Sequence, residues 1–238
     1  STQMQETLAA MPYLRDLDLG SNSLSLSATD IDFLAARRLE TLNLSNNHIT
    51  LDASSAGRFQ HMVDVRHLSL RGNPLGVAPD VGYMARLSHL NLSRCNLEQW
   101  PQGLTTLMSQ RRYQLRELDL STNRISTLPD LDDILATPFA QGIRARQVGL
   151  RWTFNYNALE QEARSGLARI QLVVHEHEGV MSPTEAFMQA DATPAQRLLW
   201  ADLFGAGENQ ALLDKLGLMR ESADSQQQPA YRRKRVWG

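Results

Sequence analysis

The only cysteine of this 238-residue chain, Cys95, is the residue type best suited to nucleophilic chemistry. A thiolate is a strong nucleophile, so one interpretation of Cys95 is a reactive thiol. The alternative is a small buried residue with a weak S–H donor. Cys95 ends the run Leu90-Asn-Leu92-Ser-Arg-Cys95, and the same pattern recurs elsewhere in the chain with asparagine at this place. The pattern therefore favours a structural cysteine.

Two other candidates for chemistry lie near the C-terminus. His175 and His177 alternate with glutamates, and a strand would place both imidazoles on one face. Two ligands do not make a metal site, so the pattern favours a solvated strand edge. The basic run 232–235 could contact phosphate or act as a nuclear signal, or could begin a helix. The sequence contains no glycine-rich phosphate loop and no convincing hydrolase triad, and we expect neither metal nor cofactor.

Composition excludes several classes of protein. The chain is 42% hydrophobic and 21% charged, with a net charge of −2, so no global field favours nucleic acid or anionic membrane. One cysteine allows no intramolecular disulfide, which fits a reducing compartment. No apolar run approaches the roughly 20 residues that cross a bilayer, and no signal-peptide pattern opens the chain. We expect an intracellular protein, or one delivered into a cytosol.

The elements that position these residues follow from a repeat, L-x-x-L-x-L-x-x-N/C-x-L, which occurs five times. The copies are Leu14-Leu17-Leu19-Asn22-Leu24, Leu39-Leu42-Leu44-Asn47-Ile49, Val65-Leu68-Leu70-Asn73-Leu75, Leu87-Leu90-Leu92-Cys95-Leu97 and Leu115-Leu118-Leu120-Asn123-Ile125. The pattern resembles the leucine-rich repeat, whose copies stack into a solenoid because none can bury its core alone. We therefore predict an α/β solenoid, with short parallel strands on the concave face and helices or turns on the convex face.

Within each copy, x-L-x-L alternates with period two and predicts a short strand with its leucines inside. The residue after the strand can satisfy backbone groups of neighbouring turns, because an amide both donates and accepts. We expect this structural ladder to consist of Asn22, Asn47, Asn73, Cys95 and Asn123.

Helix-like patterns between the strands predict helices on the convex side of the solenoid. We expect helices over 29–37, 55–63 and 104–110, a longer helix over 131–146, and a closing helix over about 160–172. A degenerate sixth copy spans 148–159, with Val148 and Leu150 in its strand and extra aromatic residues in its turn. Residues 6–13 look like the convex half of an earlier repeat, so we expect further sequence upstream.

The outward residues of the strands form the most plausible binding surface, because stacked copies place them side by side. Arg and Trp are also common at binding hot spots, which adds residues beside the strands. The predicted partner-binding residues are Asp16, Asp18, Asn43, His67, Ser69, Arg71, His89, Asn91, Arg94, Glu117, Asp119, Arg151 and Trp152, with Thr41 in the same row. Taken singly, each is better explained as an ordinary solvated sheet residue, but the surface as a whole is favoured as the binding site.

After Gly179 the repeat pattern gives way to helix signals. Ser182-Pro183-Thr184-Glu185 and Thr193-Pro194-Ala195-Gln196 are typical helix starts, and Gly217 is a typical helix end. We therefore predict two domains, a repeat domain over 1–178 and a small all-α segment over 179–238.

The second segment carries a more specific resemblance. Its pattern LLWADLF…NQALLDKL…YRRKRVW is similar to the start of the novel-ligase (NEL) domain of type III secreted bacterial ubiquitin ligases, of the invasion-plasmid-antigen class and its large Pseudomonas-like relatives. The residues that carry it are Leu199, Trp200, Phe204, Leu212, Leu213, Leu216, Arg235, Val236 and Trp237. The resemblance implies that the repeats select a host protein substrate and that a following helical domain works with ubiquitin and a ubiquitin-conjugating enzyme in the host cytoplasm.

The catalytic C-x-D motif of that family is absent, since Cys95 is followed by Asn96 and Leu97. In the family the nucleophile lies beyond the Arg-Val-Trp segment, so we expect this chain to be non-catalytic and its parent to be the ligase. The alternative is a non-catalytic repeat scaffold with a helical C-terminal cap. A nucleic-acid binder acting through the basic tail is a third, weaker alternative.

Overall fold

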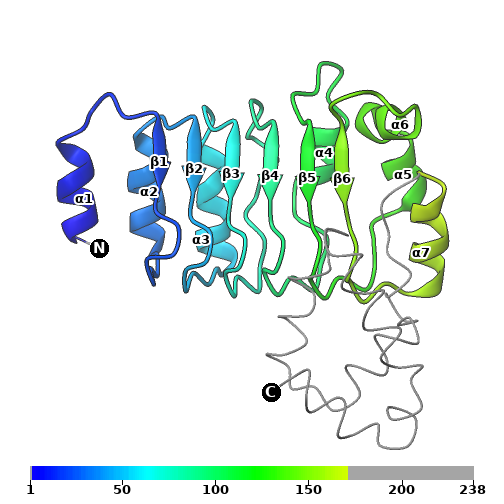
Figure 1. The fold of residues 1–238 in the computed structure, drawn as a ribbon, viewed down its shortest axis with the longest axis horizontal. Helices are drawn as coiled ribbons and strands as arrows, with labels where there is room; N and C mark the ends of the chain where they lie inside the picture. The colour runs from blue at the N-terminus through cyan, green and yellow to red at the C-terminus, as the bar shows by residue number, and fades with distance from the viewer. Residues whose placement is uncertain (1, 171–238) are drawn as a thin grey trace, which may run out of the picture. The chain divides into compact units, whose positions relative to one another are not determined.

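The computed structural model describes residues 2–170, and within them six short strands lie side by side in chain order (Figure 1). The strands are β1 (Asp16–Asp18), β2 (Thr41–Asn43), β3 (His67–Ser69), β4 (His89–Asn91), β5 (Glu117–Asp119) and β6 (Arg151–Thr153). Each pairs in parallel with the next, which confirms the predicted sheet. The predicted domain boundary, the histidine pair at 175 and 177, and the segment 179–238 lie outside the described residues.

The middle residue of every strand is buried, and its two neighbours face outward. The aligned middle residues are Leu17, Leu42, Leu68, Leu90, Leu118 and Trp152. The apolar residue two positions further on, such as Leu44 or Leu92, is completely buried behind the sheet from the second copy to the sixth, while Leu19 of the first copy is partly buried. Period-two alternation therefore places one continuous core between the strands and the convex side.

Helices lie behind the sheet and at its two ends and cover the core (Figure 1). They are α1 (Thr2–Ala9), α2 (Ala28–Ala36), α3 (Ala53–Arg58) with the 3₁₀ turn η1 (Phe59–His61), α4 (Leu104–Met108), α5 (Leu131–Leu135), α6 (Pro138–Arg144) and α7 (Gln161–Ala168). The three predicted convex helices are confirmed within a few residues at their ends, and α7 lies inside the range predicted for the closing helix.

Side-chain caps determine where the first two of these convex helices begin. Ser27 Oγ accepts from the Asp30 backbone N–H at 3.1 Å, and the Asp30 carboxylate accepts from the Ser27 N–H at 3.0 Å. Asp52 and Ser55 form the same reciprocal capping box before α3. Helix α1 is tied to α2 by Gln5 Nε2, which donates to Asp30 Oδ1 at 3.0 Å.

The single long helix predicted over 131–146 is wrong, because the segment is two helices. Helix α5 ends before Thr137, and α6 begins at Pro138. Proline has no N–H to donate and disfavours a helical residue before it, so the first helix cannot continue through this point. Thr137 Oγ1 instead caps α6 by accepting from the Ala140 N–H at 3.2 Å.

The predicted register of the sixth copy is also wrong. Val148 is fully exposed and precedes β6, whereas Trp152 pairs in register with Leu118. The repeat therefore reads Gly149-Trp152-Phe154-Asn157-Leu159, with the same spacing as the other five copies. Trp152 and Phe154 occupy the second and third leucine positions of the repeat, and Gly149 occupies the first.

Candidate protein-binding surface

Two rows of outward side chains run across the sheet, and we call them the concave surface. The first row is Asp16, Thr41, His67, His89, Glu117 and Arg151, and the second is Asp18, Asn43, Ser69, Asn91, Asp119 and Thr153. The structure thus brings together ten of the thirteen predicted partner-binding residues. Parallel pairing without a register shift is the reason, because equivalent positions of successive copies become neighbours.

Residues of the second row also form hydrogen bonds at the ends of their strands, a role that was not predicted from the sequence. Asn43 Oδ1 accepts from Ser45 N at 3.0 Å and Ser45 Oγ at 2.6 Å. Asn91 with Ser93, and Asp119 with Ser121, repeat the arrangement at 2.6–3.0 Å. The recurring signal in the sequence is Asn or Asp, then Leu, then Ser. One side-chain oxygen of each residue thus stabilises the end of its own strand, and the remaining polar atoms face outward.

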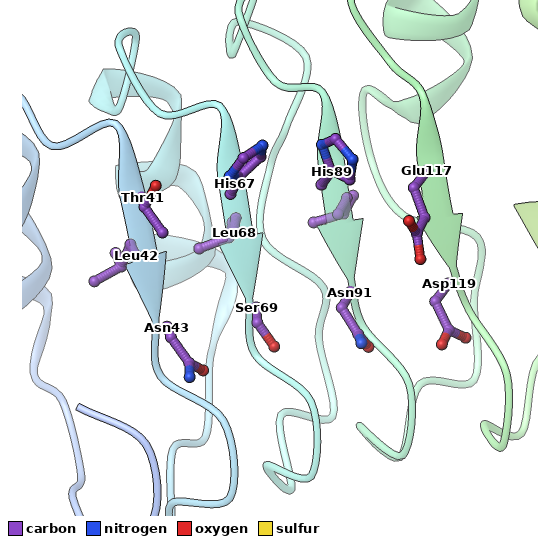
Figure 2. A pocket seen from close by; sticks show the side chains of 11 residues that line it. Thr41, Leu42, Asn43, His67, Leu68, Ser69, His89, Asn91, Glu117 and Asp119 are labelled. Atoms are coloured by element: carbon purple, nitrogen blue, oxygen red, sulfur yellow. The ribbon is translucent and has the colours of Figure 1, made fainter. Parts of the chain in front are cut away.

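An open hollow of about 230 Å³ lies in the middle of the concave surface (Figure 2). It spans β2 to β5 and is lined by Thr41, Leu42, Asn43, His67, Leu68, Ser69, His89, Leu90, Asn91, Glu117 and Asp119. Its lining is polar at the rim, and its floor is made of the leucines of the strands. A partner side chain entering it would meet amide, hydroxyl, imidazole and carboxylate groups.

The two imidazoles form the centre of this rim. His67 and His89 lie in register on neighbouring strands, and their rings meet edge to face at 4.4 Å between centroids (Figure 2). Ser88 Oγ lies 2.8 Å from His89 Nδ1. Partial burial lowers the pKa of His89, the charge of His67 lowers it further, and Glu117 raises it. At neutral pH His89 is therefore an uncharged group that can both donate and accept.

Charges lie on both sides of the imidazoles. Asp16 and Asp18 stand at the β1 end, and Glu117 and Asp119 stand on β5. Arg151 on β6 approaches Glu117, with Nη1 and Oε1 separated by 3.6 Å, and both side chains are well exposed. Such an exposed pair contributes little to stability, so it leaves Glu117 available to a partner.

Arg71 and Arg94 lie beyond the carboxyl ends of their strands, not in the two rows. Both are half-buried, and Arg94 has a positive φ of 57°. The residue before each ladder position shares this left-handed backbone, as Asn46 and Thr122 do. The two arginines therefore flank the concave surface at the edge where its strands end.

Trp152 does not belong to the surface, which corrects its prediction as a binding residue. Its side chain is 2% exposed, and its ring packs against Trp100, Phe139 and Phe154 at centroid distances of 5.6, 6.1 and 6.2 Å. The error follows from the misplaced register of the sixth copy, since Trp152 occupies a position that leucine fills in the other copies.

The predicted ladder exists from Asn47 onward. Asn123 Oδ1 accepts from the N–H groups of Cys95 and Leu97 at 3.0 and 3.1 Å, and its Nδ2 donates to the carbonyls of Leu92 and Leu120 at 2.9 Å. Asn47 bonds in the same way. Asn157, which the sequence analysis did not assign, extends the ladder into the sixth copy.

Asn22 departs from the ladder prediction. Its side chain is exposed and donates to the Gly20 carbonyl of its own turn at 2.8 Å. Only its backbone N–H joins the ladder, by donating to Asn47 Oδ1. Because no earlier repeat lies beside it among the described residues, its amide has no second turn to bridge.

Cys95 occupies the ladder position as a structural residue. Its side chain is completely buried, and Sγ donates to the carbonyls of Leu70 and Ser93 at 3.1 and 3.4 Å. Burial raises the pKa of the thiol to about 12. Sulfur replaces the amide donor but is a weaker acceptor, and the nearby Leu75 N–H donates to the Asn73 carbonyl at 2.8 Å instead.

The described residues contain no cluster of three or more His, Cys, Asp or Glu side chains able to hold a metal ion. Within the same range, no helix has the length and apolar character needed to span a membrane.

Comparisons with known proteins agree with the repeat geometry. Leucine-rich-repeat family models match residues 12–75, 86–107 and 114–133. These residues are leucine-rich repeats, and the chain carries a leucine-rich-repeat protein-interaction region.

The chain is similar to monocyte differentiation antigen CD14 of Homo sapiens, with 32% identity over 138 residues, covering 54% of this chain and 35% of the antigen. It is also similar to leucine-rich repeat-containing G-protein coupled receptor 4 of Mus musculus, with 30% identity over 131 residues, covering 55% of this chain and 13% of the receptor. A solved leucine-rich-repeat protein of Leptospira interrogans aligns at 18% identity with a TM-score of 0.48, covering 70% of this chain and 44% of that one. The chain thus spans less than half of each of these proteins.

Proposed function

We propose that the concave surface binds a host protein, and that this chain is the substrate-recognition part of a type III secreted bacterial ubiquitin ligase. The main support for protein binding is the continuous row of outward side chains on six strands, with an open hollow across β2 to β5. Solenoids present extended surfaces of this kind to proteins. The hollow is too small and too open to bury a small molecule, which favours a protein side chain.

The chemistry of the surface indicates the kind of contact. The imidazoles and amides at the centre suit hydrogen-bonding side chains, while Glu117 and Asp119 suit a basic group of the partner. A partner with a basic residue beside polar residues therefore fits the hollow.

The ligase assignment is supported by the sequence resemblance of residues 199–237. In this proposal the helical domain that follows in the parent protein supplies the nucleophile and engages ubiquitin and a conjugating enzyme. Cys95 is unsuited to that role, because it is completely buried and its thiol pKa is raised. The parent would be secreted by bacteria and act in the host cytoplasm.

Photo-crosslinking tests the binding surface. A photoreactive amino acid at His89 or Asn91 is compared with the same residue at Val63 or Tyr83, which are exposed outside the two rows. In host cytosol we expect one discrete adduct, formed only from the concave positions. Equal adducts from all four positions, or adducts from the controls alone, would refute the concave surface as the binding site.

Ubiquitin discharge tests the ligase assignment separately. A conjugating enzyme loaded with ubiquitin is mixed with this chain, or with the parent protein that continues beyond Gly238. We expect discharge by the parent alone, and no change in the parent when Cys95 is replaced by Ser. If the parent is inactive, the protein is a non-catalytic scaffold. If this chain discharges ubiquitin through Cys95, the structural role of that cysteine is wrong.

A further inference from the structure

A second polar hollow lies at the edge of the sheet where β5 and β6 begin, away from the rows of the concave surface. Its lining comes from two loops far apart in sequence, residues 109–116 before β5 and 145–150 before β6. These two strands are neighbours in the sheet (Figure 1). Tyr113 Oη donates to Gln147 Oε1 at 3.0 Å, and Arg151 N donates to the Arg116 carbonyl at 2.8 Å. The two loops are therefore held together as one surface.

The lining of this hollow carries positive charge only. It measures about 440 Å³ and is lined by Arg111, Arg112, Tyr113, Gln114, Arg116, Gln147, Val148 and Leu150. No aspartate or glutamate is among these residues. The nearest acidic side chain along the chain, Glu117, faces the concave surface and approaches Arg151.

The arginines of this hollow lack the carboxylate partner that several arginines elsewhere in the described part of the chain have. Six arginines elsewhere pair with a carboxylate, for example Arg38 with Asp64 and Arg124 with Glu98. Arg111 and Arg112 are exposed and make no ion pair with a described residue. Arg116 is held over the Tyr113 ring, with its guanidinium carbon 5.6 Å from the ring centroid.

These features define the chemistry of a ligand. Guanidinium groups bind carboxylates and phosphates through paired hydrogen bonds, and three of them without a described carboxylate partner favour an anion with more than one charge. Val148, which is fully exposed, and Leu150 add an apolar side to the hollow. An acidic segment of a protein with an adjacent apolar residue would satisfy both parts.

The alternative of nucleic acid is less well matched. Binding of a nucleic-acid strand uses a longer basic track and aromatic faces on which bases stack. Tyr113 is half-buried, packs edge-on against Phe139 at 5.9 Å and is covered on one face by Arg116. We therefore propose that the hollow formed by Arg111, Arg112, Arg116 and Val148 is a docking site for an acidic segment of a partner protein. This site does not depend on the proposed ligase activity.

Fluorescence anisotropy with a short labelled peptide tests the proposal. The peptide is rich in Asp and Glu around one central leucine, and the full chain is titrated into it at low and at physiological salt. Arg111→Glu combined with Arg112→Glu should weaken binding by at least about tenfold. The matched control, Arg15→Glu with Arg66→Glu, makes the same change of charge at exposed arginines just before β1 and β3, and should change affinity less than about twofold.

Two further variants separate a docking site from general attraction between charges. Val148→Ser should weaken binding of the leucine-containing peptide but not of an all-acidic peptide. Arg111→Gln with Arg112→Gln should give an intermediate loss, with circular dichroism unchanged because both side chains are exposed. Equal losses in the hollow and control variants would overturn the site. Tighter binding of a labelled single-stranded DNA, lost in the same arginine variants, would overturn the assignment to an acidic protein segment.

Discussion

At the residue scale, one position in each repeat decides how neighbouring turns are connected. Asparagine provides a donor and an acceptor there, and the cysteine of the fourth copy provides chiefly the donor. Cys95 keeps the bond to the Leu70 carbonyl, while the Leu75 N–H finds a carbonyl of its own turn. The only cysteine of the chain thus has a structural role.

The burial of Cys95 leads to a test of its reactivity. With its pKa raised to about 12, the thiol should not react with an aromatic disulfide reagent at neutral pH until urea unfolds the repeats. In the unfolded chain it ionises near its ordinary pKa of about 8.5, so its contribution to stability should be lost as pH rises above that value. The measurement is the rate of thiol modification with and without urea. Rapid stoichiometric reaction of the native protein would contradict the buried ladder role.

The paired imidazoles give a second test at this scale. Burial and the charge of His67 lower the pKa of His89, and Glu117 raises it. His67→Gln should therefore raise the pKa of His89, and Glu117→Gln should lower it, as measured by NMR titration of the ring protons. Because protonation is easier in the unfolded chain, His89 should weaken the native state as pH falls below about 6.5. Identical titration curves in all three proteins would show that the groups do not interact.

At the element scale, the turns of the solenoid depend on backbone conformations that most residues adopt reluctantly. The residue before the ladder position has positive φ in every copy, from Ser21 to Tyr156, and only Gly72 among them is glycine. A different constraint acts on the convex side, where the segment around Gly82 packs against the start of α4. Gly103 caps that helix with φ of 78°.

Two glycines with similar φ allow the cost of a left-handed backbone to be measured apart from the cost of a close backbone contact. A Cβ at Gly103 would lie 2.3 Å from Gly82 N and 2.4 Å from Gly82 Cα, whereas a Cβ at Gly76, with φ of 71°, would meet nothing within 4 Å. Gly76→Ala should cost about 1–2 kcal/mol for the left-handed backbone alone. Gly103→Ala should cost roughly 1–3 kcal/mol more, because backbone atoms must move. Urea unfolding measures the loss of stability in both variants. Equal losses would mean that a backbone shift relieves the contact at Gly103 at little cost in free energy.

At the scale of the whole molecule, the ladder joins copies that cannot fold alone. The Asn123 side chain bonds backbone groups of the fourth copy and of its own copy, whereas the Asn22 side chain bonds only within its own turn. Each buried backbone group left without a partner costs about 1–3 kcal/mol. Asn123→Ala should therefore destabilise the protein by at least about 3 kcal/mol, allowing for partial hydration. Asn22→Ala should stay within about 0.5 kcal/mol.

Urea denaturation monitored by tryptophan fluorescence would compare these two variants. The aromatic cluster of Trp100 and Trp152 reports on the last repeats, next to the turn that Asn123 supports. A small loss for Asn123→Ala, similar to that for Asn22→Ala, would show that water replaces the amide and that the ladder contributes little to cohesion between repeats.

The architecture could be predicted from the sequence because its signals are local. A leucine every second residue buries one face of a strand, and five copies with nearly constant spacing align those faces. The strands, the concave rows and the role of Cys95 all follow from this spacing. The break at Pro138 also had a local signal, but the helical pattern on both sides concealed it.

The sixth copy and the arginine hollow were decided by tertiary structure. Trp152 and Phe154 fill leucine positions only because the preceding repeat and α6 leave a space that fits aromatic rings. Whether Trp152 is exposed or buried depends on which residue pairs with Leu118, and no local preference settles that register. The arginines at 111, 112 and 116 meet Gln147 and Val148 because two loops of different length end at adjacent strands. Local spacing thus determined which residues face inward within a repeat, whereas the packing of one repeat on the next determined which distant loops share a surface.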